Sequence, residues 1–281
     1  MDISLSEPRL LILEPRLDHE AARRKAEEKK TGALGSGIGG LLSRPKPEDV
    51  VLSTTQRRVE PLWHVVCTAH YKYDRTRTYT VPASGPDVRS VTVRGEDYGV
   101  AGSGKNPPGF ALSVLEHCTE DRREEVWIDG LTGAAVGNGA ALLAGPSTFV
   151  ADPAALAGDD TLVVPPDHRA SAIVRQLLAK LMVPLQADQI FEEQLAVPTL
   201  ELAYRPVWAF EFELPAKARR GAVEVVGLTG ETRTATSLRL QINRHVSRDA
   251  VFDIGSDTIG MIVPGGNIAL KLARAALDRG Y

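Results

Sequence analysis

The chain has 281 residues, of which 43% are hydrophobic and 25% are charged, and its formal net charge is −3. This composition indicates a globular protein large enough for two domains, and it excludes binding to nucleic acid or to an anionic membrane through overall charge. Two cysteines exclude a disulfide-dense scaffold, and no stretch reaches the roughly 20 apolar residues of a membrane-spanning helix. Because the N-terminus also lacks the basic start and apolar core of a signal peptide, we expect a cytoplasmic protein.

Residues 1–45 predict a charged helix followed by a glycine-rich linker. The apolar run at residues 9–14 is typical of a short strand, and Asp18 can cap a helix over residues 19–30. Every face of this helix is polar, so we expect it to bury little. Glycines within residues 31–40 match the spacing of a dinucleotide-binding loop. That motif needs a preceding strand and a following helix, and neither is expected here, so the segment is interpreted as a linker.

Residues 46–138 predict a first α+β repeat with half-buried antiparallel strands, because apolar and polar side chains alternate there. One strand face carries Trp63, Val65, Cys67, Ala69 and Tyr71. A turn is expected at residues 74–75, so that residues 76–81 return as a hairpin partner. A third strand over residues 88–93 then leads into a long loop over residues 95–109.

Residues 139–166 are rich in alanine, glycine and proline and predict a linker between two domains. The remaining residues, 167–281, predict a second α+β repeat with a C-terminal helix. Within it, an amphipathic helix capped by Asp167 is expected over residues 170–181. Residues 250–254 predict a further strand.

Two landmarks occur in both repeats. Pro61 and Pro206 each open a Pro-x-Trp strand, and residues 130–133 and 227–230 each read Gly-Leu-Thr-Gly. The matched positions on apolar strand faces favour core tryptophans over ligand-stacking ones. The predicted fold class is therefore α+β, with two related helix-plus-antiparallel-sheet units in tandem.

A strand that ends in Asp129-Gly-Leu-Thr-Gly, after a strand with a proline and an aromatic residue, resembles the PepSY-like, cystatin-like repeats. Those small α+β domains commonly end a strand in an Asp-x-x-Thr-Gly turn. The resemblance covers about residues 61–136 and 204–236, and Val226 replaces the aspartate in the second copy. The resemblance implies binding or inhibition rather than catalysis, and it supplies no catalytic residues.

Four residues could form a zinc site, because zinc prefers cysteine and histidine ligands: Cys67, His70, His117 and Cys118. Strand geometry argues against one compact site, since Cys67 points away from the histidines beside it. Cys67 is also interpreted as a core thiol, because the duplicated position is an apolar phenylalanine. Composite sites such as Cys67 with Cys118, or His70 with His117, stay open. Two cysteines are enough for one disulfide, but a disulfide is not expected in a reducing cytosol.

Residues 99–106 nearly match the phosphate-binding motif G-x-x-x-x-G-K-[ST], with Asn106 in place of the hydroxyl residue. Two prolines follow, where a phosphate-binding loop needs a helix N-terminus. The segment is therefore interpreted as a surface loop. Lys105, with Ser103 and Asn106, is the predicted contact for an anionic ligand.

These observations predict a non-enzymatic binding or adaptor protein of unknown partner. We expect a protein partner that meets a sheet edge, the loop over residues 95–109 or the N-terminal helix. Nucleic acid is not expected, and a homo-oligomer stays open. The alternative is a zinc protein or a ligand-processing enzyme with its site at the cysteine and histidine group or at Lys105. No catalytic residue and no cofactor are predicted, and zinc is the alternative left open.

Overall fold

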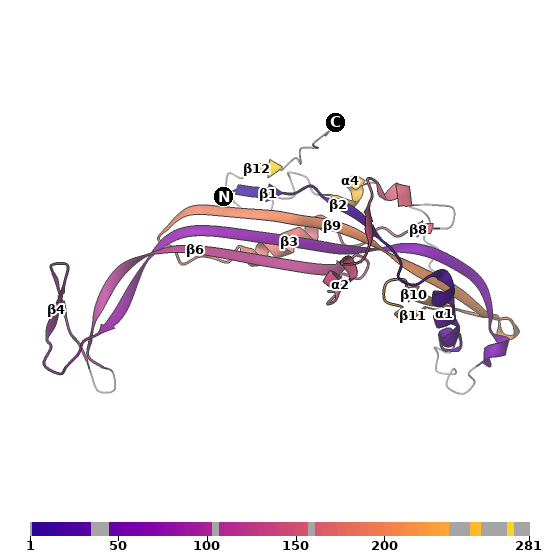
Figure 1. The fold of residues 1–281 in the computed structure, drawn as a ribbon, viewed down its shortest axis with the longest axis horizontal. Coiled ribbons are helices and arrows are strands. Elements are labelled where there is room, and N and C mark those ends of the chain that lie inside the picture. Colours follow the sequence, from indigo (N-terminus) through magenta and orange to yellow (C-terminus); the bar gives the residue numbers. More distant parts are fainter. Residues whose placement is uncertain are drawn as a thin grey trace.

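The computed structural model describes residues 2–34, 45–102, 107–156, 161–235, 248–253 and 269–272. The chain forms an arch built on three long neighbouring strands (Figure 1). In order across the sheet they are β6 (Gly109–Asp129), β3 (Val51–Pro82) and β9 (Gln189–Leu214), and each neighbouring pair is antiparallel. Ladder hydrogen bonds between three chain segments therefore hold most of the length of the molecule.

Shorter strands extend this sheet beside β3 and along the outer side of β9, giving ten strands with mixed directions in the described part of the chain. The strands along β9 are β1 (Asp2–Leu5), β2 (Arg9–Leu13) and β10 (Arg219–Val226). The remaining strands of the sheet are β7 (Ser147–Phe149), β8 (Thr161–Val163), β11 (Thr232–Ala235) and β12 (Ala269–Leu272), which pair with β2, β3, β10 and β1 respectively. A separate two-stranded sheet, β4 (Ser90–Val93) and β5 (Glu96–Gly99), stands at one end of the arch.

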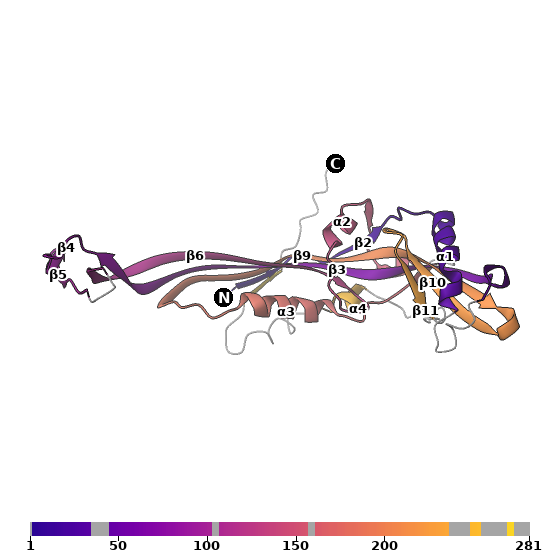
Figure 2. The same cartoon turned by 90° about the horizontal axis from the view of Figure 1, so that it is seen from below.

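Two helices of the described residues cover parts of this sheet, α1 (His19–Ala33) and α3 (Ala170–Leu181); Figure 2 shows α3 lying along the long strands. The short helical segments are α2 (Gly139–Leu143), α4 (Arg248–Phe252), and the 3-10 turns η1 (Pro47–Asp49), η2 (Pro153–Leu156) and η3 (Pro215–Lys217). The predicted cap of α1 is confirmed, since the Asp18 carboxylate accepts a hydrogen bond from the Ala21 amide at 2.7 Å. The cap of α3 is Arg169 rather than Asp167.

The expectation that α1 buries little is wrong. Its buried residues are alanines, with Ala22 and Ala26 fully buried beside the aromatic side chains of β9. On β10, a Cβ atom at Gly221 would lie 2.5 Å from the Ala33 carbonyl oxygen. The helix thus approaches the sheet closely through small residues, a contact that a search for large apolar side chains misses.

The prediction of two helix-plus-antiparallel-sheet units in tandem is wrong, because strands dominate the described chain and the long ones share one mixed sheet. The strand and helix that precede each long antiparallel pair in the sequence pack on the other pair. β2 and α1 lie on β9 and β10, whereas β8 and α3 lie on β3 and β6. Neither half of the sequence closes its own core, and local periodicity cannot reveal this crossing.

The duplicated landmarks make matched contacts that explain the crossing. The Gly130 amide donates to the Pro61 carbonyl at 2.9 Å, and the Gly227 amide donates to the Pro206 carbonyl at 2.8 Å. The carbonyl of each glycine then accepts two amides from the segment before a helix. The Gly130 carbonyl accepts hydrogen bonds from the amides of residues 167–168, before α3. The Gly227 carbonyl accepts hydrogen bonds from the amides of residues 16–17, before α1. Each turn therefore anchors the helix that packs beside it.

Other local predictions are corrected by the sheet. Residues 74–75 lie inside β3 and form no turn, and residues 63–72 pair with β6 and β9 rather than with residues 76–81. Within the expected loop over residues 95–109, β5 forms a strand. The expected linker over residues 139–166 carries α2, β7 and β8.

Near the C-terminus, the predicted strand over residues 250–254 is mostly the helix α4, and the start of the predicted terminal helix is β12. Pairing of β12 with β1 overrides the helical pattern there. The rest of that predicted helix lies outside the described residues, as do most of the glycines interpreted as a linker.

Candidate functional site

The residues predicted as a zinc site do not converge. Cys67 is fully buried in the core, as predicted for a core thiol, and burial raises the pKa of its thiol to about 12. His70 Nδ1 lies 2.6 Å from Asp121, and His117 Nδ1 lies 2.7 Å from Asp74, so each histidine has a different carboxylate partner. No group of three or more His, Cys, Asp or Glu residues in the described chain could hold a metal ion.

The two cysteines are also far apart along the ladder. Cys67 is paired with Glu124, whereas Cys118 is paired with Tyr73, six residues further along β3. That separation is roughly 20 Å at 3.3 Å per residue, well beyond the reach of a disulfide. Both thiols are free. The other predicted site, Lys105 with Ser103 and Asn106, lies outside the described residues and stays a prediction.

The two landmark tryptophans occupy unequal environments. Trp63 is fully buried, and its indole Nε1 donates to the His168 carbonyl at 2.8 Å. Trp208 is partly buried beside the His19 ring at 5.1 Å and the Arg57 guanidinium at 5.5 Å. Trp63 is therefore a core residue, as the sequence predicted, and Trp208 lies at the edge of the core under α1.

An ionic cluster is buried where the two copies meet in the sheet. Glu60 is 2% exposed and lies opposite Arg205, at 3.2 Å, in the register of β3 and β9. The Glu60 carboxylate also contacts Arg58 at 3.1 Å and Arg233 at 2.8 Å. Burial raises the pKa of Glu60, but Arg233 and Arg58 outweigh it and hold this pKa below its usual value.

Since Pro61 and Pro206 are equivalent, Glu60 and Arg205 are equivalent positions that face each other. Identical residues there would bring like charges together, so the copies differ where they meet. Arg205 also pairs with Asp129, and Arg58 with Glu224, so the three arginines of the cluster balance three carboxylates. A cavity of about 230 Å³ opens beside the cluster. The charges in its wall balance one another, although the Nε atoms of Arg58, Arg205 and Arg233 are buried without a hydrogen-bond partner in the described part of the chain. We interpret the cluster as structural.

A histidine clamp joins the three long strands. The His64 ring stacks on Trp127 with centroids 4.7 Å apart and planes 6° apart. Its Nδ1 lies 2.9 Å from Glu201 of β9, and its Nε2 lies 2.9 Å from Glu125 of β6. Both ring nitrogens can donate only when the imidazole is protonated. Burial lowers the pKa of His64, but the bonds to the two glutamates raise it above its usual value.

This clamp predicts a pH-dependent stability. The pKa of His64 is higher in the folded protein than its unfolded value of 6.5. Protonated His64 therefore stabilises the fold at pH values below 6.5, and this contribution is lost as pH rises through the folded pKa. Hydrogen bonding to His64 lowers the pKa of Glu125 and Glu201 below 4.5. Their contribution to stability is present above pH 4.5 and is lost as pH falls through the folded pKa.

His64→Gln should therefore lower Tm more at about pH 5.5 than at about pH 8.5. His70→Gln, whose Asp121 partner is 78% exposed, is the control. Equal losses for His64→Gln at both pH values would contradict the clamp.

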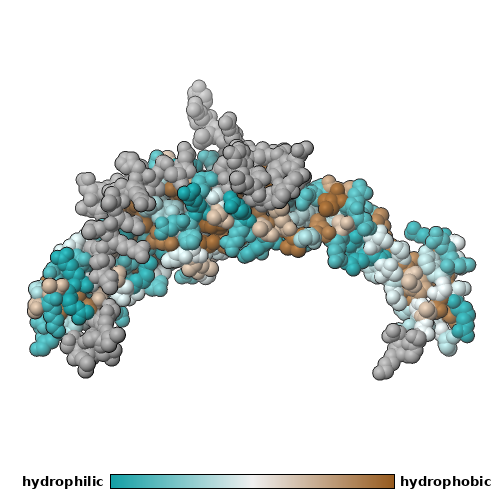
Figure 3. Space-filling view, turned by 180° about the vertical axis from the view of Figure 1, so that it is seen from behind, coloured by the Kyte–Doolittle hydropathy of each residue, from teal (hydrophilic) through white to brown (hydrophobic). Residues whose placement is uncertain are grey.

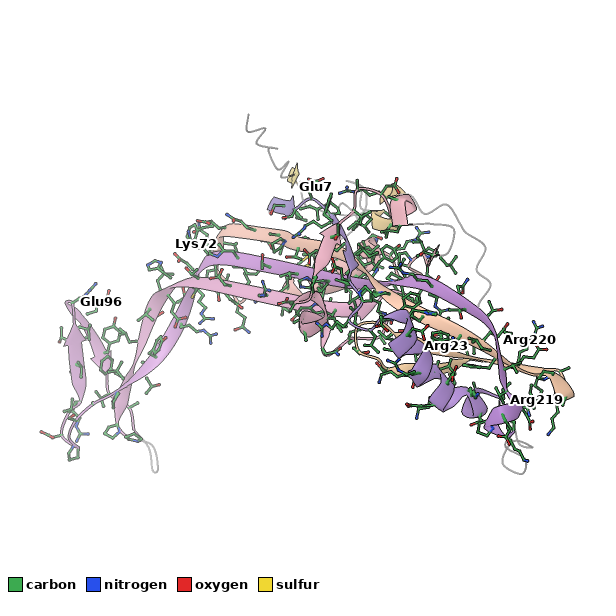
Figure 4. All side chains as sticks on the ribbon, turned by 45° about the vertical axis from the view of Figure 1, so that its right-hand side comes forward. Glu7, Arg23, Lys72, Glu96, Arg219 and Arg220 are labelled. Atoms are coloured by element: carbon green, nitrogen blue, oxygen red, sulfur yellow. The ribbon has the colours of Figure 1, made fainter. Side chains whose placement is uncertain are left out.

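Beyond Asp74, the last β3 residue paired with β9, strands β3 and β6 continue without a third strand. We call this two-stranded part, residues 75–82 with residues 109–116, the arm. Figure 4 labels Lys72 near its base and Glu96 on the β4–β5 sheet beyond it, and Figure 3 shows hydrophobic surface on the arm at the right of the view. Tyr79 and Leu115 are 51% and 55% exposed on it. The arm thus presents apolar side chains away from the core.

The outer edge of β6 is open between two bridges. Gly109 pairs with Ala101 at one end and Ile128 pairs with Ala135 at the other, and no described strand pairs with the edge between them. Open edges are usually protected by charged side chains. Residues 116–125 follow this rule, with seven charged residues in ten, whereas residues 110–115 read Phe-Ala-Leu-Ser-Val-Leu and carry no charge.

This change along β6 is readable in the sequence, but only the structure shows that the strand is at an edge. Local sequence patterns do not join Phe110 and the charged run after it into one strand. The functional feature missed from the sequence is therefore the uncharged part of the edge, which also matches the composition of strand-pairing segments.

Comparisons with protein-family models, with curated proteins and with solved structures found no match. The resemblance to PepSY-like and cystatin-like repeats accordingly stays a prediction. None of the described helices is long and apolar enough to cross a membrane.

Proposed function

We propose that this protein is a non-enzymatic binding protein that takes up an extended protein segment along the uncharged edge of its arm. The observation that carries the proposal is the unprotected stretch of residues 110–115 on an open edge. Unpaired backbone groups on such an edge can accept a partner strand, and the side chains beside them select it.

The geometry of the edge identifies which backbone groups are available. Gly109 exchanges hydrogen bonds with Ala101 at 2.8 and 3.0 Å on the outer side. Outward groups alternate along an antiparallel strand, and the register of β6 with β3 has no bulge. The amides and carbonyls of Ala111, Ser113 and Leu115 therefore point outward. A partner strand would begin beside Ala111, where the bridge to Ala101 ends.

Two further features support a binding role over the zinc alternative. The cysteines and histidines that could bind zinc are separated and paired elsewhere. An isolated two-stranded ribbon is marginally stable, so a third strand would stabilise the arm. The two free, separated thiols fit a reducing compartment, and we propose a cytoplasmic location.

A peptide-display selection on the intact protein tests this proposal. We expect enrichment of extended peptides that contain an uncharged, β-branched segment. Ser113→Pro removes one outward amide while leaving the bonds to β3 in place, and should weaken peptide binding about tenfold. The matched control is Arg123→Pro, which removes an outward amide from the same edge, beyond the roughly ten residues that a partner strand starting beside Ala111 would cover.

The proposal would be wrong if no peptide were enriched, or if the selected peptides bound Ser113→Pro as tightly as the unmodified protein. Equal loss in both proline variants would also contradict it, because it would indicate general damage to β6 rather than use of the arm. Circular dichroism of each variant checks that the sheet is retained.

A further inference from the structure

Resting on the proposed function, we infer the chemistry and direction of the partner: an extended segment antiparallel to β6, with basic residues first and uncharged β-branched residues after them. The uncharged part of the edge, residues 110–115, continues directly into residues 116–125. A partner strand of ordinary length would therefore contact both parts. Its two halves meet surfaces of different chemistry.

The second part of the edge is acidic. Residues 116–125 contain five carboxylates and two arginines. Arg122 is turned inward, where its Nη1 donates to the Leu181 carbonyl at 2.7 Å. Asp121 is 78% exposed, and Glu124 is 37% exposed with its nearest cation, Lys180, at 3.8 Å. These carboxylates favour lysine or arginine on a strand lying beside them.

The direction follows from the neighbours that this edge already has. Ala101 pairs antiparallel with Gly109, and Ala135 pairs antiparallel with Ile128. A partner that continues along the line of Ala101 would share this direction. Its C-terminal half would then lie beside residues 111–115, and its N-terminal half beside the acidic part. The order along the partner is therefore basic first and uncharged second.

The side chains of the arm determine which residues suit the C-terminal half of the partner segment. Leu112 and Val114 lie on the face of Tyr79, while Leu115 is exposed on the opposite face. Thr76, opposite Leu115, and Ser113 add small polar groups to that opposite face. Alternating valine and threonine would place apolar groups toward Leu112 and hydroxyl groups toward Ser113.

Synthetic peptides test this inference on the full chain. The first is Lys-Thr-Lys-Thr-Thr-Val-Thr-Val-Thr-Val, blocked at both ends, which places valines on the face of Leu112 and lysines on the face of Asp121 over about ten rungs of the ladder. The second has the reverse order, and the third replaces both lysines by glutamates. By fluorescence anisotropy the first should bind roughly fivefold tighter than either of the others, and should weaken as salt is added.

A charge reversal on the protein checks the contact. Asp121→Lys should reduce the preference for the lysine peptide and raise binding of the glutamate peptide roughly fivefold. Glu20→Lys makes the same change in net charge at a 66% exposed position on α1 and should change neither. Equal effects of the two substitutions would show that only overall charge matters and would overturn the inference.

The remaining outcomes separate the inference from the proposed function. If the reverse or glutamate peptide bound as tightly as the first, and Ser113→Pro still abolished binding, the direction and charge would be wrong while edge binding would stand. If Ser113→Pro left binding of all three peptides unchanged, the proposed function itself would fail.

Discussion

Glu60→Gln is expected to lower the free energy of unfolding by about 3–5 kcal/mol, because it removes one charge from a buried, balanced cluster. Glu60 is 2% exposed and is shared by Arg58, Arg205 and Arg233. Glutamine keeps the size of the side chain but leaves three guanidinium groups facing two carboxylates. The loss is measured by urea denaturation at neutral pH, where the lowered pKa keeps Glu60 ionised.

The matched control is Glu213→Gln, which removes a carboxylate from the same sheet at the solvent-exposed end of β9. Glu213 lies 3.9 Å from Arg220, which is 60% exposed, so this substitution should cost less than about 1 kcal/mol. Equal losses in the two variants would contradict the role of the cluster. The double variant Arg58→Met with Glu224→Met removes a neutral pair and should cost less than Arg58→Met alone.

Trp63→Ala is expected to lower the free energy of unfolding by about 3–5 kcal/mol, the range for a large aromatic side chain removed from a core. The side chain is fully buried, lies 5.6 Å from the Phe252 ring, and gives a hydrogen bond to His168. Truncation would leave a cavity and an unpaired carbonyl beneath the start of α3.

The duplicated position supplies the control for this substitution. Trp208→Ala should cost less, because Trp208 is only partly buried and its indole nitrogen has no hydrogen-bond partner in the described part of the chain. Denaturation of both variants gives the comparison. Equal losses would mean that the two landmarks are energetically equivalent, which the observed environments contradict.

Local patterns in the sequence were enough to predict particular elements. The Asp18 cap and the apolar spacing over residues 170–181 predicted both main helices, because capping and helical periodicity act within a few residues. Strand alternation around Trp63 placed that side chain and Cys67 in the core. Strand geometry also indicated that Cys67 and the nearby histidines would not form one compact metal site.

Elsewhere, local patterns misled. Residues 74–75 look like a turn in isolation, yet β6 pairs with β3 through this point and keeps it extended. At residues 269–272, pairing with β1 replaces the expected helix by a strand. In both places contacts with distant residues outweigh local preference, which is weak for short segments.

The sequence by itself determined that two copies of a Pro-x-Trp strand and a Gly-Leu-Thr-Gly turn exist, and that Trp63 and Cys67 face a core. Only the tertiary structure decided how the copies combine. Each turn anchors the helix from the other half of the chain, and β2 and β8 each pair with a long strand of the other half, so one sheet forms instead of two units. The open edge at residues 110–115 arises in the same way, because whether a strand has one neighbour or two depends on pairing between distant segments.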